Sequence, residues 1–159
     1  MSRNCLVVDL DKCIGCHACE VACKNENGIV LGEYWNRVLQ IGPHGTFPDL
    51  EQYWLPVQCQ QCEKAVEKCT LCGQLTSAGQ EPACVAACCA NARFYGDLDD
   101  PNSDVSKAVA AADPASLHTL HDAGNKPLTR YILSDKIATW HDVDAIKPAS
   151  DAQDAAWFA

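Results

Sequence analysis

Four cysteines near the start of the chain follow one another at short, fixed intervals. They are Cys13, Cys16, Cys19 and Cys23, with two residues between each of the first three and three residues before the last. Cysteines this close are poorly placed to form disulfides with one another, whereas their sulfurs can converge on one small object. The run therefore predicts that the chain folds around a bound metal group.

The spacing is that of ferredoxin-type iron–sulfur ligation, in which three thiolates hold one [4Fe-4S] cubane and the fourth reaches a second cubane. One run of this kind therefore predicts a partner run. The partner extends from Cys69 to Cys88, with a longer gap before its third cysteine. If the last cysteine of each run crosses over, the ligands of the first cluster are Cys13, Cys16, Cys19 and Cys88. Those of the second cluster are then Cys69, Cys72, Cys84 and Cys23.

Small residues in the first run suit the close passage of the backbone around a cluster. Gly15 is expected to relieve crowding there. Ala18 and Ala22 would let backbone N–H groups approach the sulfides of the cluster, and such hydrogen bonds adjust a reduction potential. Cys23 lies about one helical turn beyond Cys19, so we expect it to point away toward the second cluster.

Composition supports a metal-dependent fold and limits the partners. The 159-residue chain has twelve cysteines but only three Phe, four Tyr and four Trp, so part of the core is expected to be inorganic. A formal net charge of −9 disfavours nucleic acid as a partner. No stretch approaches the roughly eighteen apolar residues of a membrane span, and we see no secretory signal. We therefore expect a cytoplasmic protein, which a signal-bearing partner could carry across a membrane.

The pattern along the chain predicts an α+β fold with a bacterial two-cluster ferredoxin-like core. A strand at 5–10, the ligand loop and a helix at 17–26 form the first half. A helix at 84–91 and a strand at 92–96 form the second half. Between them, residues 29–57 are predicted to form a β insertion.

That insertion contains two strand-like stretches, 34–41 and 52–57, separated by a loop at 42–45. Residues 1–98 are predicted to form the di-cluster domain with this insertion. Residues 99–159 are predicted to form an extended arm that docks on a partner.

The arm is expected to contain three short elements and a tail. Ser103 can cap a helix at 105–112, and a second helix is expected at 116–121 and a strand at 128–134. The low-complexity tail, which ends in Trp157-Phe158-Ala159, is expected to be disordered alone and to clamp a partner.

With both runs placed, the chain resembles the iron–sulfur electron-transfer subunits of the dimethyl sulfoxide reductase family of molybdenum and tungsten enzymes. The likeness extends from Val7 to about Leu133. Besides the first run, it rests on EYWNRV at 33–38, LPVQCQQC at 55–62, KCTLC at 68–72, PACVAAC at 82–88 and GDLDDPNS at 96–103.

The resemblance implies that this chain is a redox subunit of an anaerobic oxidoreductase complex. The subunit itself would have no catalytic residues. Its partner would be a large catalytic subunit carrying a molybdenum or tungsten bis-pterin cofactor. A quinone-linked membrane subunit or a soluble donor would exchange electrons with the complex.

The chain departs from the family in the number of its cysteine groups. Family members usually have four groups and four cubanes, whereas here the chain passes from Cys62 almost directly to Cys69, so two clusters are missing. Cys89 stands where the family usually has proline. We expect the left-over cysteines to be free or structural thiols rather than ligands of a third cluster; they are Cys5, Cys59, Cys62 and Cys89.

Three other interpretations remain. Cys59-x2-Cys62 and Cys69-x2-Cys72 could together hold zinc, but this would leave Cys84 and Cys88 without a role and the first run one ligand short. A free-standing two-cluster ferredoxin would be a soluble carrier, for which the long arm is scarcely needed. A structural module would use the clusters only to hold the fold, and its clusters would resist reduction at accessible potentials.

Overall fold

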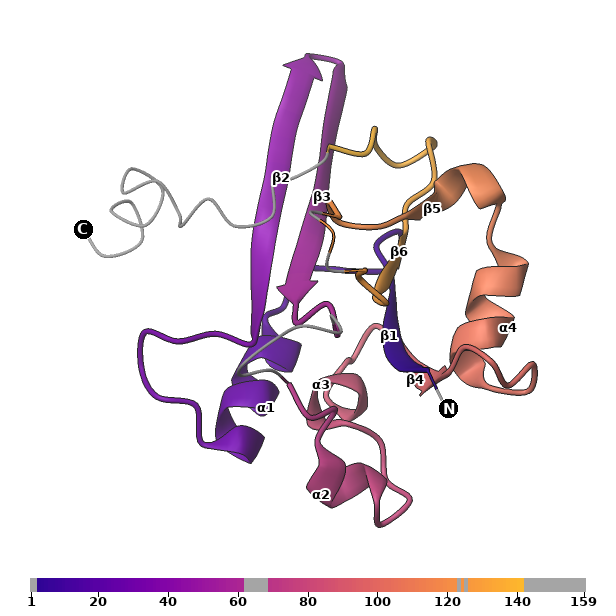
Figure 1. The fold of residues 1–159 in the computed structure, drawn as a ribbon. Helices are drawn as coiled ribbons and strands as arrows, with labels where there is room; N and C mark the ends of the chain where they lie inside the picture. Colours follow the sequence, from indigo (N-terminus) through magenta and orange to yellow (C-terminus); the bar gives the residue numbers. More distant parts are fainter. Residues whose placement is uncertain (1–2, 62–68, 123, 125, 142–159) are drawn as a thin grey trace.

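The central element is β1 (Asn4–Asp9), which pairs with a strand on each side. The computed structural model describes residues 3–61, 69–122, 124 and 126–141. β4 (Arg93–Asp97) pairs antiparallel with β1, and β6 (Arg130–Ile132) pairs parallel with it. β5 (Leu117–His118) completes the sheet in the order β4-β1-β6-β5 (Figure 1). The apolar run of β1 is buried on both faces, as expected of a central strand.

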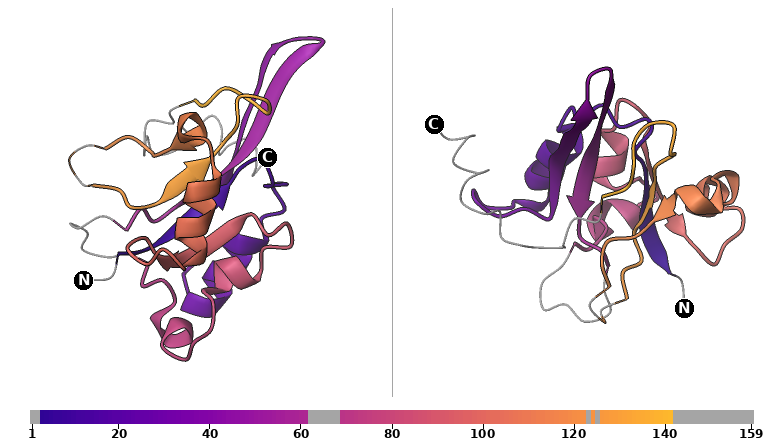
Figure 2. Two further views of the ribbon diagram at one scale, coloured as in Figure 1. Left: turned by 90° about the vertical axis from the view of Figure 1, so that its right-hand side faces the viewer. Right: turned by 90° about the horizontal axis from the view of Figure 1, so that it is seen from above.

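A long hairpin of β2 (Asn36–Thr46) and β3 (Asp49–Gln58) projects beyond this sheet (Figures 1 and 2). The predicted loop at 42–45 is wrong, because both strands run on to a turn at 47–48. A register shift between Ile41 and His44 accommodates Gly42, which has φ +99°, and the proline that follows it. Glycine and proline are tolerated in a strand at such an irregularity.

Three helices lie together below the sheet in Figure 1. They are α1 (Ala18–Asn27), α2 (Gly73–Thr76) and α3 (Ala83–Ala86). The helix predicted at 84–91 is wrong beyond Ala87, because the backbone leaves the helix there and turns at Asn91, which has φ +48°. This turn lets β4 begin at Arg93 and return along β1.

The C-terminal part begins with α4 (Asp104–Ala111), which packs against the sheet. The predicted cap is confirmed, since the Ser103 hydroxyl accepts a hydrogen bond from Ser106 N at 3.2 Å. The helix predicted at 116–121 is wrong. A 3-10 turn, η1 (Pro114–Ser116), leads there into β5, whose backbone pairs with β6 instead.

β6 confirms the strand predicted within 128–134. β6 joins the predicted arm to β1 in one sheet. The predicted domain boundary between residues 98 and 99 stays a prediction, and so does the two-cluster ferredoxin-like core. The tail with Trp157 and Phe158 lies outside the described residues. No helix in the described ranges is long and apolar enough to cross a bilayer.

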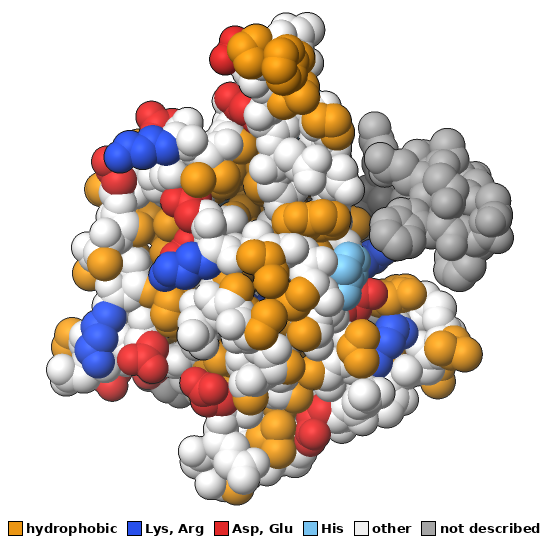
Figure 3. Space-filling model, turned by 180° about the vertical axis from the view of Figure 1, so that it is seen from behind, with side chains coloured by type: hydrophobic (Ala, Val, Ile, Leu, Met, Phe, Trp, Pro, Cys, Tyr) orange, Lys and Arg blue, Asp and Glu red, His pale blue; other side chains and the backbone are white. Residues whose placement is uncertain are grey.

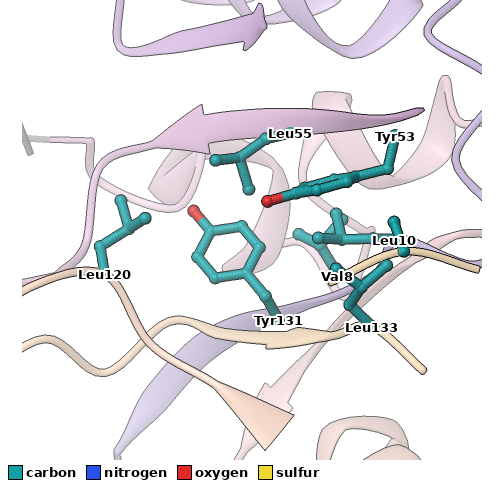
Figure 4. Packing of buried hydrophobic residues seen from close by; sticks show 8 residues of the cluster. Val8, Leu10, Tyr53, Leu55, Leu120, Tyr131 and Leu133 are labelled. Carbon is teal, nitrogen blue, oxygen red and sulfur yellow. The ribbon is translucent and has the colours of Figure 1, made fainter. Parts of the chain in front are cut away.

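In the largest apolar cluster of the described residues, the base of the hairpin packs against the sheet. Side chains of β3 meet those of β1 and β6 face to face (Figure 4). The members of this cluster are Val8, Leu10, Tyr53, Leu55, Leu120, Tyr131, Leu133 and Ala138. A second cluster lies between the hairpin base and the helices and contains two predicted ligands, Cys19 and Cys84. Part of the core is therefore built from cysteine.

Leu55→Ala should lower the thermal unfolding midpoint by several degrees. Leu55 is fully buried, and removing such a side chain typically costs about 2–5 kcal/mol of unfolding free energy. Leu31→Ala is the matched control because Leu31 is 96% exposed. Circular dichroism under anaerobic conditions measures both midpoints, and equal midpoints for the two variants would contradict the packing described.

Candidate iron–sulfur sites

The four cysteines predicted for the first cluster lie around one hollow. About 350 Å³ of empty space, which includes open solvent at its mouth, lies there. Val8, Val38 and Pro56 form an apolar part of its wall, and Arg93 also lines it. The cysteines at the hollow are Cys13, Cys16, Cys19 and Cys88. The structure thus brings Cys88 from the second run to the three leading cysteines of the first.

The loop that carries these ligands is covered by Trp54 of β3. Gly15 has φ +66°, and a Cβ added there would lie 2.2 Å from the indole ring. The His17 ring meets the same indole edge-on, with 6.0 Å between ring centroids. Gly15 is therefore required by the packing of Trp54, in addition to any crowding by a cluster. The sequence does not predict this contact, because Trp54 belongs to the inserted hairpin.

The helix after this loop is tied to the hairpin by Glu20. The Glu20 carboxylate accepts a hydrogen bond from Val38 N at 3.0 Å and lies 3.2 Å from His17 Nδ1. α1 is thereby held beside β2, with Cys19 and Cys23 on its buried side. The insertion consequently helps to position the first ligand loop.

The four cysteines predicted for the second cluster also lie near one another. Asn27 Nδ2 is 3.9 Å from Cys23 Sγ and 3.7 Å from Cys72 Sγ, so one amide bridges the two runs. The pKa of Cys23 is raised to about 12, first by burial and then by the sulfurs of the three other predicted ligands; these are Cys69, Cys84 and Cys72. The structure thus places Cys23 near cysteines of the second run.

Backbone N–H groups point at three of the predicted ligands. Leu71 N lies 3.3 Å from Cys69 Sγ, and Ala92 N lies 3.3 Å from Cys88 Sγ. A hydrogen bond from Gly15 opposes the effect of burial on the pKa of Cys13. Hydrogen bonds to ligand sulfurs raise the potential of a cluster. These donors lie in turns that the sequence does not reveal, and hydrogen bonds from the backbone at Ala18 and Ala22 to the cluster sulfides stay a prediction.

The buried thiols hold their protons strongly when no metal is bound. Burial raises the pKa of Cys69 to about 11, with smaller contributions from neighbouring sulfurs. Thiolate, not thiol, is the form that binds metal, so ligation at these positions must release protons. The arrangement therefore favours a metal group whose binding offsets the free-energy cost of burying several negatively charged thiolates.

A cation lies beside these thiols. Arg93 is only 4% exposed, and its Nη2 donates a hydrogen bond to Gln58 Oε1. Its Nε and Nη1 are buried and have no hydrogen-bond partner among the described residues. Buried donors normally find an acceptor, and buried charges are normally paired. The sequence gives no signal for this residue beyond its place at the start of a predicted strand.

These observations fit an iron–sulfur cubane. Eight soft sulfur donors in two sets of four suit iron, and the anionic cluster would offer acceptors to the unpaired donors of Arg93. Within the described ranges, no three His, Cys, Asp or Glu side chains converge closely enough to hold a single metal ion. The zinc interpretation also needs Cys62, which lies outside the described residues.

The left-over cysteines have different surroundings. Cys5 is fully buried on β1 among apolar side chains. Cys59 contributes to the raised pKa of Cys69, and Gln61 Nε2 lies 3.8 Å from Cys59 Sγ. Cys89 is exposed, with its Sγ 3.8 Å from that of Cys16. All eleven described cysteines are free thiols.

Comparison with known proteins identifies the family. Residues 6–25 match the 4Fe-4S binding domain family. A protein of Halobacterium salinarum, named for the iron–sulfur subunit of a dimethyl sulfoxide reductase, is 30% identical over 83% of this chain and 79% of its own length. The chain belongs to the iron–sulfur subunits of the dimethyl sulfoxide reductase family of molybdopterin oxidoreductases. The resemblance found in the sequence is confirmed.

Two further relatives support this assignment. A subunit of the sulfite dehydrogenase of Allochromatium vinosum is 28% identical, over 83% of each protein. A component of the polysulfide reductase of Wolinella succinogenes is 28% identical, over 77% of this chain and 90% of its own length. The first two alignments, over 210 and 203 residues, are longer than this 159-residue chain, so those relatives contain stretches that it lacks.

Membership of the family establishes the general role. The chain is an iron–sulfur electron-transfer subunit of an oxidoreductase rather than a free-standing ferredoxin, and it acts with a catalytic partner. The assignment of individual cysteines to each cluster stays a prediction.

Gly15→Ala should prevent normal loading of the first cluster, because the new methyl group would strike the Trp54 ring. Gly28→Ala is the matched control, since Gly28 has a similar φ of +60° and open space around its Cα. Iron and acid-labile sulfide per chain, measured after anaerobic reconstitution, should fall for Gly15→Ala and stay near wild type for Gly28→Ala. Full loading of both variants would contradict the close packing of Trp54 on this loop.

Proposed function

We propose that the chain binds two [4Fe-4S] clusters and passes electrons to or from a large catalytic subunit with a molybdenum or tungsten bis-pterin cofactor. The observation that supports the proposal is that one cysteine of each run lies beside the other run. Cys88 stands at the hollow of the first run, and Cys23 stands among the cysteines of the second. This is the ligation pattern of a two-cluster ferredoxin-type wire.

The chemistry that cubanes supply when bound is one-electron transfer at iron. The residues of this chain would hold the clusters close together and keep water away. Cys19 of the first set and Cys84 of the second belong to one apolar cluster, packed with Val38, Leu71 and Val85. A short, dry separation of this kind suits electron transfer between the two sites.

The partner surface is proposed from exposed apolar residues. Phe47 is 89% exposed at the tip of the hairpin, close to the exposed Leu50, and Val30 and Leu31 are exposed in the loop before β2. Viewed from behind, hydrophobic side chains cover the hairpin tip and the middle of the face (Figure 3). Such residues are suited to contact with another subunit.

The reaction itself would be set by the catalytic partner. The relatives are named for dimethyl sulfoxide, sulfite and polysulfide enzymes, so similar iron–sulfur subunits serve different substrates. A quinone-linked membrane subunit or a soluble donor would complete the electron path. A cytoplasmic location stays a prediction.

Anaerobic purification of the native complex tests the proposal. Iron, acid-labile sulfide, and molybdenum or tungsten are measured per copy of this chain. The iron and sulfide bound by the isolated partner are subtracted from the totals of the complex. About eight irons and eight sulfides should remain for this chain, as two cubanes require. A colourless chain that contains zinc or disulfides at the eight positions would contradict it.

Substitution of single cysteines tests the proposed ligands. Cys84→Ser should reduce the iron content of the reconstituted chain by at least about four atoms, because one cubane loses a thiolate ligand. Cys5→Ser and Cys89→Ser are controls, one buried and one exposed, and both should retain about eight irons. If Cys89→Ser loses a cluster while Cys84→Ser keeps both, the proposed ligand set is wrong.

A further inference from the structure

Arg93 occupies a special place in the fold. It is the first residue of β4, opposite Val8 of β1, and its side chain turns inward to line the hollow of the first cysteine set. Among the described residues it is the one basic side chain that is buried. A guanidinium does not lose its proton in proteins, so the fold holds a permanent positive charge at this position.

Among the described residues, no carboxylate balances the charge of Arg93. Its Nη2 donates to the neutral amide of Gln58, while Nε and Nη1 have no partner among the described residues. The buried carboxylate of Asp9 is already paired with Lys12 at 2.7 Å. Burying an unpaired charge is strongly unfavourable, so a nearby anion is required.

Once they ligate clusters, the thiolates of both sets are the available anions. Arg93 lines the same hollow as Cys13, Cys19 and Cys88 of the first set. Cys19 in turn belongs to one apolar cluster with Cys84 of the second set. One guanidinium therefore lies close to cysteines of both sets.

We propose that Arg93 is a positive charge shared by the two cluster sites, and that it raises the reduction potentials of both clusters. Reduction adds one electron, taken from the partner subunit, and neither forms nor breaks a bond. The charge of a cubane with its four thiolates then changes from about −2 to about −3. A fixed positive charge nearby stabilises the more negative state, and a dry surrounding strengthens this interaction.

Arg93 is thus a positioning and tuning residue for electron transfer, and its test is a potential rather than a rate. The variants are Arg93→Gln, which removes the charge, and Arg93→Lys, which retains it. Arg3→Gln is the matched control, because Arg3 is exposed and pairs with Asp99 on the surface. Each variant is made in the complete complex, and the potentials of both clusters are measured by redox titration followed by electron paramagnetic resonance.

Arg93→Gln should shift the reduction equilibrium of both clusters at least tenfold toward the oxidised state. This corresponds to a fall of about 59 mV for a one-electron couple. Arg93→Lys and Arg3→Gln should stay within about threefold of wild type. If Arg93→Gln shifts the equilibria no more than Arg3→Gln does, the proposal is wrong and Arg93 serves the fold alone.

A measurement on the unaltered protein covers the case in which Arg93→Gln does not assemble. The wild-type complex is labelled with ¹⁵N-arginine and reduced, and electron–nuclear double resonance should detect nitrogen coupled to the cluster spins. Absence of this coupling would overturn the inference. The inference about Arg93 rests on the proposed function. A wild-type chain without two cubanes would refute that function. Two cubanes whose potentials do not depend on Arg93 would refute only the inference.

Discussion

The proposed exchange of one cysteine between two distant runs is the constraint on which the rest of the structure depends. Cys23 lies near cysteines of the second set, and Cys88 lies at the hollow of the first. Each proposed cluster therefore ties together residues that lie far apart in sequence, and its ligation becomes part of the stability of the fold. The short helices α2 and α3, of four residues each, suit elements held by ligands rather than by their own length.

The protein around the sulfurs shields the cysteines, holds their segments in place and provides buried positive charge. Trp54, from the inserted hairpin, covers the first ligand loop, while Glu20 ties α1 to β2. Arg93 provides buried positive charge, and Asn27 reaches sulfurs of both runs. The hairpin thus has two uses: its base shields the cysteines, and its tip presents Phe47 outward. Electron transfer needs both a dry site and a route to a partner.

The sequence predicts the parts of this protein that are encoded locally. Cysteine spacing predicts the two sets, and short-range patterns predict β1, α1 and the Ser103 cap. It fails where tertiary pairing decides: Leu117 and His118 form a strand because β6 lies beside them. Glycine and proline favour a turn at 42–45, but pairing across the hairpin absorbs them in a register shift. Arg93, Trp54 and Asn27 act through contacts between distant segments, which no local pattern reveals.

Anomalous diffraction at the iron absorption edge, from crystals of the native complex, tests the central claim most directly. The account predicts two separate four-iron sites in this chain, with Cys88 Sγ at the site of Cys13 and Cys23 Sγ at the site of Cys69. Each run binding a cluster with its own four cysteines, or isolated single-metal peaks at these sulfurs, would contradict it.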